Sequence, residues 1–188
     1  MDMFTVEGGV RLEGSVPVAG SKNAALPMMV AALLVPGETR LTHVPALKDI
    51  RTLEKLLETL GARVTREGHA LVVDARELDS CEAPYDLVKT MRASVYVLGP
   101  LLARMGKARV SLPGGCAWGP RPVDQHLKGM EALGAKIEID AGYILAEAPQ
   151  GLRGADITLD VASVGATGNI MMAAVTAKGT TRIHNAAR

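Results

Sequence analysis

The stretch LLVPGETRL at residues 33–41 is the first of three related stretches, and they determine the expected fold. LLARMGKARV follows at residues 101–110, and AVTAKGTTRI follows at residues 174–183. Each consists of the apolar end of a helix, a glycine suited to a helix C-cap, and a short β-prone run. Self-similarity at a regular spacing indicates repeated supersecondary units, so we read the chain as three copies of one unit.

An amphipathic helix that ends in Leu-Gly-Ala follows in the first two copies, at residues 60–62 and 133–135. In the second of these helices Val123, Leu127 and Met130 share one face. In the first the apolar face consists of Ile50, Leu53, Leu56, Leu57 and Leu60. Both patterns predict helices that lie against the core with one side buried.

Segments of alternating polarity follow both helices, at residues 63–73 and 136–145. They predict β-hairpins that turn at Glu67-Gly68 and at Ala141-Gly142. The repeated unit is therefore helix, strand, helix and hairpin, about 70 residues long.

The first helix of each unit is apolar nearly all round, at residues 24–35, 93–103 and 170–177. A helix without a polar face is buried, so we expect these helices in the interior, with sheets and amphipathic helices outside them. The third copy stops at Arg188, before its second helix and its hairpin. We expect a chain cut inside a repeat, because the alternative, a genuine terminus, leaves the last strand and helix without a covering layer.

Composition excludes several classes of protein. Hydrophobic residues make up 48% of the 188 residues and charged residues 22%, which is ordinary for a globular protein with a buried core. The 21 basic and 20 acidic residues nearly cancel, and only 3% of residues are aromatic. Neither a basic patch nor a stacking platform for nucleic acid is therefore expected.

Two cysteines, Cys81 and Cys116, are too few for a disulfide scaffold and fit a reducing, intracellular setting. The longest apolar run, residues 24–35, contains Pro27 and is too short to span a bilayer. Asp2, Glu7 and Glu13 precede it, whereas a secretory signal begins with basic residues. We expect a soluble, cytoplasmic protein with no membrane partner.

Motifs for cofactors are absent from the sequence. It contains no phosphate-loop motif, dinucleotide fingerprint or serine-hydrolase elbow. The four histidines have no metal-ligand spacing: His43, His69, His126 and His184. The sequence gives no support for a metal or another cofactor.

The segment LPGGCAWGPRPVD at residues 112–124 predicts a loop that runs into a helix near Pro122. It makes the second copy longer than the first, as an inserted functional loop would. The Cys116 thiol lies five residues from Arg121 and beside a helix N-terminus, where positive charge favours the reactive thiolate. The alternative is a small buried residue, since free cysteine is among the most buried residue types.

A second candidate is Lys22, in the segment GSKN at residues 20–23. A lysine at a helix start, beside exposed backbone N–H groups, suits an anion, and the alternative is a solvated surface lysine. The equivalent segments are residues 91–94, which contain Arg92, and residues 163–167. If the interior helices form one bundle, their N-termini cluster, and Lys22, Arg92 and Arg121 surround a single anionic ligand.

These segments resemble the UDP-N-acetylglucosamine enolpyruvyl transferases, also called UDP-N-acetylglucosamine 1-carboxyvinyltransferases. The resemblance rests on GSKNAALP at residues 20–27, YDLVKTMRAS at residues 85–94, the cysteine loop at residues 113–124, SVGAT at residues 163–167 and NAAR at residues 185–188. It covers the whole chain, and the cysteine loop is specific to this family. Because the family's members are much longer, the chain resembles their N-terminal half.

The resemblance implies an α/β protein with the inside-out α/β barrel of the enolpyruvyl transferase fold, in which the substrate cleft lies between two halves of three repeats each. Residues 1–21 would belong largely to the second half, and residues 22–188 would form the domain that carries the catalytic loop. The implied reaction transfers the enolpyruvyl group of phosphoenolpyruvate to the 3′-hydroxyl of UDP-N-acetylglucosamine and releases phosphate. It is the first committed step of peptidoglycan synthesis, and it needs no cofactor.

The resemblance also implies roles for individual residues. Cys116 would protonate or add to phosphoenolpyruvate, and it would be the thiol that fosfomycin alkylates. Lys22 and Arg121 would hold the phosphate and carboxylate of phosphoenolpyruvate, Arg92 would help to gather the anions, and Asn23 would orient the sugar. The uridine diphosphate would be lined by Arg121, Pro122, Val123, Asp124, His126, Ser163, Val164 and Gly165. Several fixed cations suit a dianion in a water-poor cleft and stabilise the departing phosphate.

Two departures from the family affect these expectations. Val161 and Ala162 precede Ser163, where some members have a lysine directed toward the sugar nucleotide. One diphosphate contact is therefore missing or supplied elsewhere. The family's aspartate base and further arginines belong to its second half, so we expect this chain alone to be inactive.

Three alternative functions remain open. The enolpyruvyl-shikimate-phosphate synthases share the architecture but lack the cysteine loop. The RNA 3′-phosphate cyclases share part of the topology but work through a histidine and a nucleotide, and the near-zero net charge counts against them. A non-catalytic module that binds a sugar nucleotide is the third, and binding of UDP-N-acetylglucosamine without turnover would distinguish it.

Overall fold

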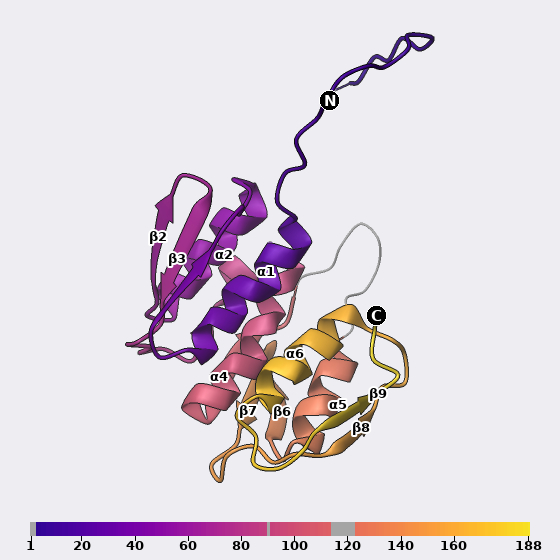
Figure 1. Cartoon of the computed structure of the whole chain (residues 1–188). Coiled ribbons are helices and arrows are strands. Elements are labelled where there is room, and N and C mark those ends of the chain that lie inside the picture. Colours follow the sequence, from indigo (N-terminus) through magenta and orange to yellow (C-terminus); the bar gives the residue numbers. More distant parts are fainter. Residues whose placement is uncertain (1–2, 90, 114–122) are drawn as a thin grey trace.

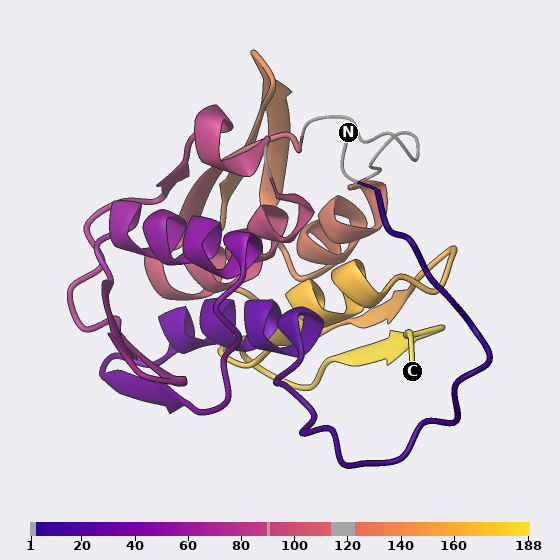
Figure 2. The same ribbon diagram turned by 90° about the horizontal axis from the view of Figure 1, so that it is seen from above.

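The computed structural model describes residues 3–89, 91–113 and 123–188, without the side chain of Arg92. The predicted loop residues Cys116, Arg121 and Pro122 lie outside this description. Apolar helices occupy the middle of the molecule, and the sheets lie around them (Figures 1 and 2). In the described part of the chain the sheets remain separate and form no closed barrel.

The first repeat follows the predicted order of elements. Helix α1 (Lys22–Ala31) continues as the 3₁₀ turn η1 (Ala32–Leu34), and β1 (Glu38–Leu41), α2 (Lys48–Thr59), β2 (Arg63–Glu67) and β3 (Ala70–Asp74) follow. Strand β3 pairs antiparallel with both β1 and β2. The predicted apolar face of α2 is confirmed, because its isoleucine and leucines are fully buried.

The second repeat has the same order and a larger sheet. It contains β4 (Glu82–Ala83), α3 (Tyr85–Val88), η2 (Arg92–Val97), α4 (Leu98–Met105), β5 (Lys107–Ser111), α5 (Asp124–Ala132), β6 (Lys136–Asp140) and β7 (Tyr143–Glu147). The sheet order is β4-β5-β7-β6, with β4 parallel to β5. Its hairpin turns at Ala141-Gly142 as predicted, and both residues have the positive φ of a type I′ turn. The first hairpin turns at Gly68-His69, one residue later than predicted.

The third repeat consists of β8 (Asp156–Thr158), α6 (Val164–Ala174) and β9 (Arg182–His184), and its two strands are parallel. Helix α6 begins six residues before the predicted segment, because the Ser163 hydroxyl caps it by accepting a hydrogen bond from the Ala166 N–H at 3.2 Å. Strands β4 and β8, each before the interior helix of its repeat, were not predicted. They are too short to carry a period-two pattern.

Helix α4 is the centre of the core. Residues 98–102 are all buried, and the helix packs against α6, β5, η1 and η2. Its closest approach to α6 is at Gly99, where an added Cβ would lie 2.5 Å from the Asn169 carbonyl oxygen. No side chain fits at that distance, so glycine allows the two helix backbones to meet.

The prediction that all three apolar helices are buried on every side is only partly right. Helix α1 exposes Met28, and α6 exposes Val164, Met171 and Val175 at 57–72% of their surface. In the first two repeats a second helix and a hairpin follow the strand. In the third repeat β9 is followed by residues 185–188.

Residues 3–20 contain no helix or strand and run away from the body of the molecule (Figures 1 and 2). Seven of their large apolar side chains are at least 78% exposed: Met3, Phe4, Val6, Val10, Leu12, Val16 and Val18. All of them except Met3 have even numbers, so in a regular strand those six would lie on one side. The segment therefore has the pattern of β-strands with an uncovered apolar face.

No helix in the residues that the structure describes is long and apolar enough to cross a membrane.

The contact between α4 and α6 gives a prediction for stability. We expect Gly99→Ala to destabilise the fold by about 2 kcal/mol or more, because the new methyl group meets backbone atoms that cannot rotate away. Urea unfolding measures the change. Gly37→Ala is the matched control, because a Cβ there meets only Val35 at 3.9 Å, and it should cost less than about 1 kcal/mol. Equal stability of the two variants would contradict this account of the helix contact.

Candidate functional site

A pocket of about 790 Å³ lies where several helices begin. Helix α1 contributes Lys22, Asn23, Leu26 and Pro27, and α2 contributes Asp49. The start of α5 contributes Asp124, Gln125 and His126. Met91 and the η2 residues Ala93, Val95 and Tyr96 form another wall. The last wall is residues 161–165, which lead into α6. All three repeats therefore contribute to one pocket.

The structure brings together seven of the residues selected from the sequence. They are Lys22, Asn23, Asp124, His126, Ser163, Val164 and Gly165. Val123 directly precedes α5 and is half-buried, and it is not among the lining residues. Arg92 begins η2, but its side chain is outside the described part, as are Cys116, Arg121 and Pro122.

The helix starts offer backbone N–H groups to this pocket. Ser21 caps α1 and Ser163 caps α6, each through its side-chain oxygen. Free N–H groups and the helix dipole make such N-termini favourable for anions. With Lys22 on the first turn of α1, the pocket can hold a negatively charged group.

Lys22 already has an anionic partner. Its ammonium donates to Asp49 Oδ2 at 2.6 Å, and a little over one third of each side chain is exposed. A ligand anion that binds Lys22 must therefore compete with the Asp49 carboxylate. Asp49 was not predicted from the sequence, because a carboxylate on the first turn of a helix is common and indicates no particular function.

Gln125 connects the start of α5 to the segment that precedes α6. Its amide nitrogen donates to Asp124 Oδ2 at 2.8 Å and to Asp160 Oδ2 at 3.0 Å, and its amide oxygen accepts from the Asp160 N–H at 2.8 Å. Lys128 also donates to Asp160, at 2.6 Å. The hydrogen bond from Lys128, and to a smaller extent the one from Gln125, lowers the pKa of the Asp160 carboxyl. The side chains hold the two helix starts next to each other.

His126 is a buried wall of the pocket. Its Nδ1 lies 2.9 Å from Asn169 Nδ2, and its ring contacts Tyr96 in a T-shaped arrangement with centroids 6.4 Å apart. Tyr96 and Asn169 were both missed from the sequence. An asparagine inside the apolar segment of α6 was an available signal, since a buried amide needs partners from other elements.

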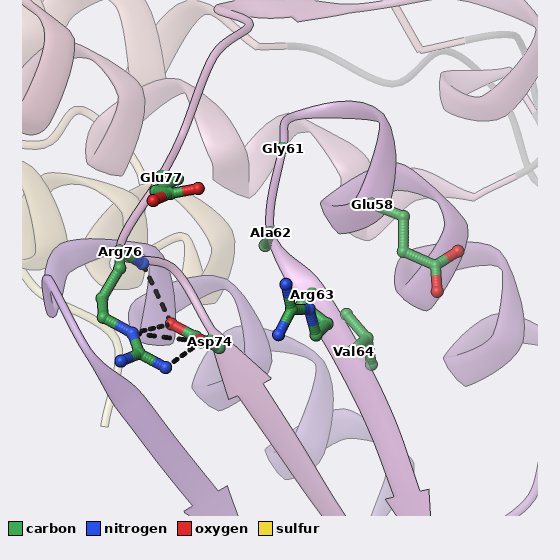
Figure 3. A pocket seen from close by; sticks show the side chains of 8 residues that line it. All are labelled: Glu58, Gly61, Ala62, Arg63, Val64, Asp74, Arg76 and Glu77. Atoms are coloured by element: carbon green, nitrogen blue, oxygen red, sulfur yellow. Dashed lines mark hydrogen bonds and ion pairs between the residues drawn. The ribbon is translucent and has the colours of Figure 1, made fainter.

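A second, smaller pocket lies where α2 ends and the first hairpin begins (Figure 3). None of the residues selected from the sequence lines it. Figure 3 shows Arg76 and Asp74 directed at each other, and Arg76 Nε donates to Asp74 Oδ1 at 2.9 Å. This hydrogen bonding lowers the pKa of Asp74 to about 2. The pair joins the end of β3 to the following turn, which is a structural role.

Similarity to known proteins agrees with this geometry. The family model described as EPSP synthase (3-phosphoshikimate 1-carboxyvinyltransferase) matches residues 6–188. The chain belongs to this family.

Curated relatives within the EPSP synthase family carry a more specific name. UDP-N-acetylglucosamine 1-carboxyvinyltransferases of Trichlorobacter lovleyi and Acinetobacter baylyi are each 57% identical to the chain over 188 residues. The match covers the whole chain and 45% of each relative, so the chain spans less than half the length of these proteins. The resemblance stated from the sequence motifs is therefore confirmed.

Solved structures of the family confirm the predicted fold. The enolpyruvyl transferase NikO from Streptomyces tendae superposes with a TM-score of 0.79 at 27% identity, covering 94% of this chain and 42% of NikO. EPSP synthase from Acinetobacter baumannii has a TM-score of 0.71 at 18% identity, covering 90% of this chain and 40% of that protein, and it supports the fold alone.

The contacts of Asp160 give a prediction about its titration. Lys128→Met should raise the pKa of Asp160 toward its ordinary value of 3.8, because the first cause of its lowering is removed. Asp160 stabilises the fold at pH above its unfolded-state pKa, and the contribution is lost as the pH falls through the lower folded-state value. Carboxyl ¹³C NMR measures the midpoint. Lys136→Met, on β6, is the control and should leave it unchanged; an unchanged midpoint in Lys128→Met would contradict the assignment.

Proposed function

We propose that this chain forms one wall of the active site of a UDP-N-acetylglucosamine 1-carboxyvinyltransferase. That enzyme transfers the enolpyruvyl group of phosphoenolpyruvate to the 3′-hydroxyl of the sugar nucleotide, as the first committed step of peptidoglycan synthesis. The observation that carries the proposal is the single pocket lined by Lys22, Asn23, Asp124, His126 and residues 163–165. These motif residues are far apart in the sequence, and the fold brings them together at helix starts, where they can contact a common ligand.

The chemistry of this wall suits two anionic substrates. Lys22 would exchange Asp49 for the phosphate of phosphoenolpyruvate, and the helix starts at Ser21 and Ser163 would add N–H donors. His126 and the residues at the start of α6 would contact the uridine diphosphate. Asn23, next to Lys22, would orient the sugar, while Val161 and Ala162 supply only apolar surface.

The loop around Cys116 completes this wall in the proposal. Cys116 would protonate or add to phosphoenolpyruvate, and Arg121 and Arg92 would supply further positive charge. Protonation of an enol carbon needs an acid at a fixed position, and a loop that covers the site excludes water. The base and the remaining arginines would come from the rest of the full-length enzyme, so the 188-residue chain would bind UDP-N-acetylglucosamine without turnover.

The reactivity of Cys116 tests this function. Fosfomycin should add once, to Cys116 and not to Cys81, and faster with UDP-N-acetylglucosamine present; intact and peptide mass spectrometry locates the adduct. Lys22→Met should slow the addition at least about tenfold, because a charged hydrogen bond to the phosphonate is lost. Lys55→Met, an exposed lysine on α2, is the control.

Three results would change this proposal, each in a different part. Equal labelling of both cysteines would contradict an organised thiol in this pocket. Labelling of Cys116 by a general alkylating agent but not by fosfomycin would show that the pocket needs the rest of the enzyme. Turnover by the chain alone would contradict the proposed division of the active site.

We also propose that residues 1–21 belong to the second half of the enzyme and residues 22–188 to the domain described above. The six exposed apolar side chains at even positions support this, because they suit a strand face that packs elsewhere. In the second and third repeats the strand after the interior helix, β5 or β9, pairs with a strand that precedes that helix, β4 or β8. Among the described residues β1 has no such partner, and its edge opposite β3 is unpaired.

Removal of residues 1–18 tests the domain proposal. The shortened chain should keep its free energy of unfolding within about 0.5 kcal/mol, because residues 3–18 are all exposed and contribute little burial. Urea unfolding of both chains gives the comparison. A loss of about 2 kcal/mol or more would show that the segment packs against this domain instead.

A further inference from the structure

Asn169 is a polar residue in the middle of helix α6, and it is fully buried. Its side-chain amide bonds to three groups on other elements. The oxygen Oδ1 accepts from the Gly99 N–H at 2.8 Å. The nitrogen Nδ2 donates to the Val95 carbonyl at 3.0 Å and lies 2.9 Å from His126 Nδ1. The amide oxygen and the amide nitrogen of Asn169 therefore both have hydrogen-bond partners, although the side chain is fully buried.

The two backbone partners determine which way the amide faces. A backbone N–H only donates and a backbone carbonyl only accepts, so Oδ1 must face Gly99 and Nδ2 must face Val95. The second hydrogen of Nδ2 is then directed at His126 Nδ1. A nitrogen that accepts a hydrogen bond carries no proton, so the ring proton of neutral His126 is on Nε2.

Nε2 of His126 lies beside Gly165, and both residues line the pocket. A Cβ added to Gly165 would be 3.1 Å from Nε2, and Gly165 is one of the pocket residues at the start of α6. An N–H at this position is a hydrogen-bond donor. Phosphate oxygens and the carbonyls of a uracil ring only accept hydrogen bonds at neutral pH, so the donor form is the one that suits them.

We infer that Asn169 is a positioning residue that holds His126 with its proton on Nε2, so that the ring donates to an acceptor group of the bound sugar nucleotide. Asn169 does not touch the ligand and acts through His126. The ligand part of this inference rests on the proposed function, and the position of the proton does not.

Asn169→Asp is the variant that tests the inference, because it keeps the shape and replaces the donor with an acceptor. A carboxylate facing Nδ1 favours the proton on that nitrogen and leaves Nε2 as an acceptor, as carboxylates do in catalytic triads. ¹⁵N NMR of histidine-labelled chain distinguishes a protonated from an unprotonated ring nitrogen. The spectra are recorded at about pH 8.5, above the ordinary histidine pKa, so that the ring is neutral. His126→Gln assigns the signals.

In the unaltered chain we expect an unprotonated Nδ1, and in Asn169→Asp a protonated one. Thr167→Val is the control: Thr167 is a buried polar residue of the same helix, but it accepts from the Ala187 N–H, and its loss should leave the ring unchanged. A protonated Nδ1 in the unaltered chain would overturn the inference, even if Asn169→Asp does not fold. An unprotonated Nδ1 in a folded Asn169→Asp would overturn it as well.

Calorimetry with UDP-N-acetylglucosamine separates this inference from the proposed function. Asn169→Asp should weaken binding by about tenfold, as the loss of one hydrogen bond to the ligand does, and Thr167→Val by less than about twofold. A switched ring proton with unchanged affinity would overturn the positioning role and leave the proposed function intact. No binding by the unaltered chain, with Nδ1 unprotonated, would count against the proposed function and support the assignment of the proton.

Discussion

The close contact between α4 and α6 is the constraint on which the rest of the structure depends. Two apolar helices can bring their backbones together only where one of them has no side chain, and Gly99 provides that position. Asn169 then reaches across the contact and accepts the Gly99 N–H. Because that N–H is in the first turn of α4, it has no partner within its own helix. The amide therefore meets a requirement that an apolar side chain could not.

The same amide links the core to the pocket. Its nitrogen Nδ2 contacts the Val95 carbonyl in η2 and the His126 ring in α5. One side chain of the third repeat therefore connects two elements of the second. Gln125, the neighbour of His126, joins α5 to the segment before α6 in a similar way. The helix starts that line the pocket are thus held by hydrogen bonds of fixed direction. Apolar packing alone would allow the helices to slide, whereas these bonds specify one arrangement.

The order of helices and strands could be predicted from the sequence because the same sequence signals recur in successive repeats. The glycines near residues 37, 106 and 179 and the two Leu-Gly-Ala segments gave the order of elements, and the two hairpins were predicted to within one residue at their turns. The pocket was predicted as a cluster of helix starts for the same reason. Asp49, Tyr96 and Asn169 could not be found this way, since their roles depend on contacts between elements that periodicity does not describe.

The uncovered apolar surfaces follow from the logic of repeats. In the first two repeats a helix such as α2 and a hairpin such as β2–β3 cover the strand and the interior helix, and the exposed side chains of α6 lie where the third repeat has no such cover. Residues 3–20 also expose apolar side chains, because this segment packs against no sheet or helix. Each surface is costly in water, and neither can cover the other while residues 3–20 run away from the body (Figure 1). A repeat is stabilised by packing against its neighbours, so these are the two surfaces of the chain on which further packing would bury the most apolar area.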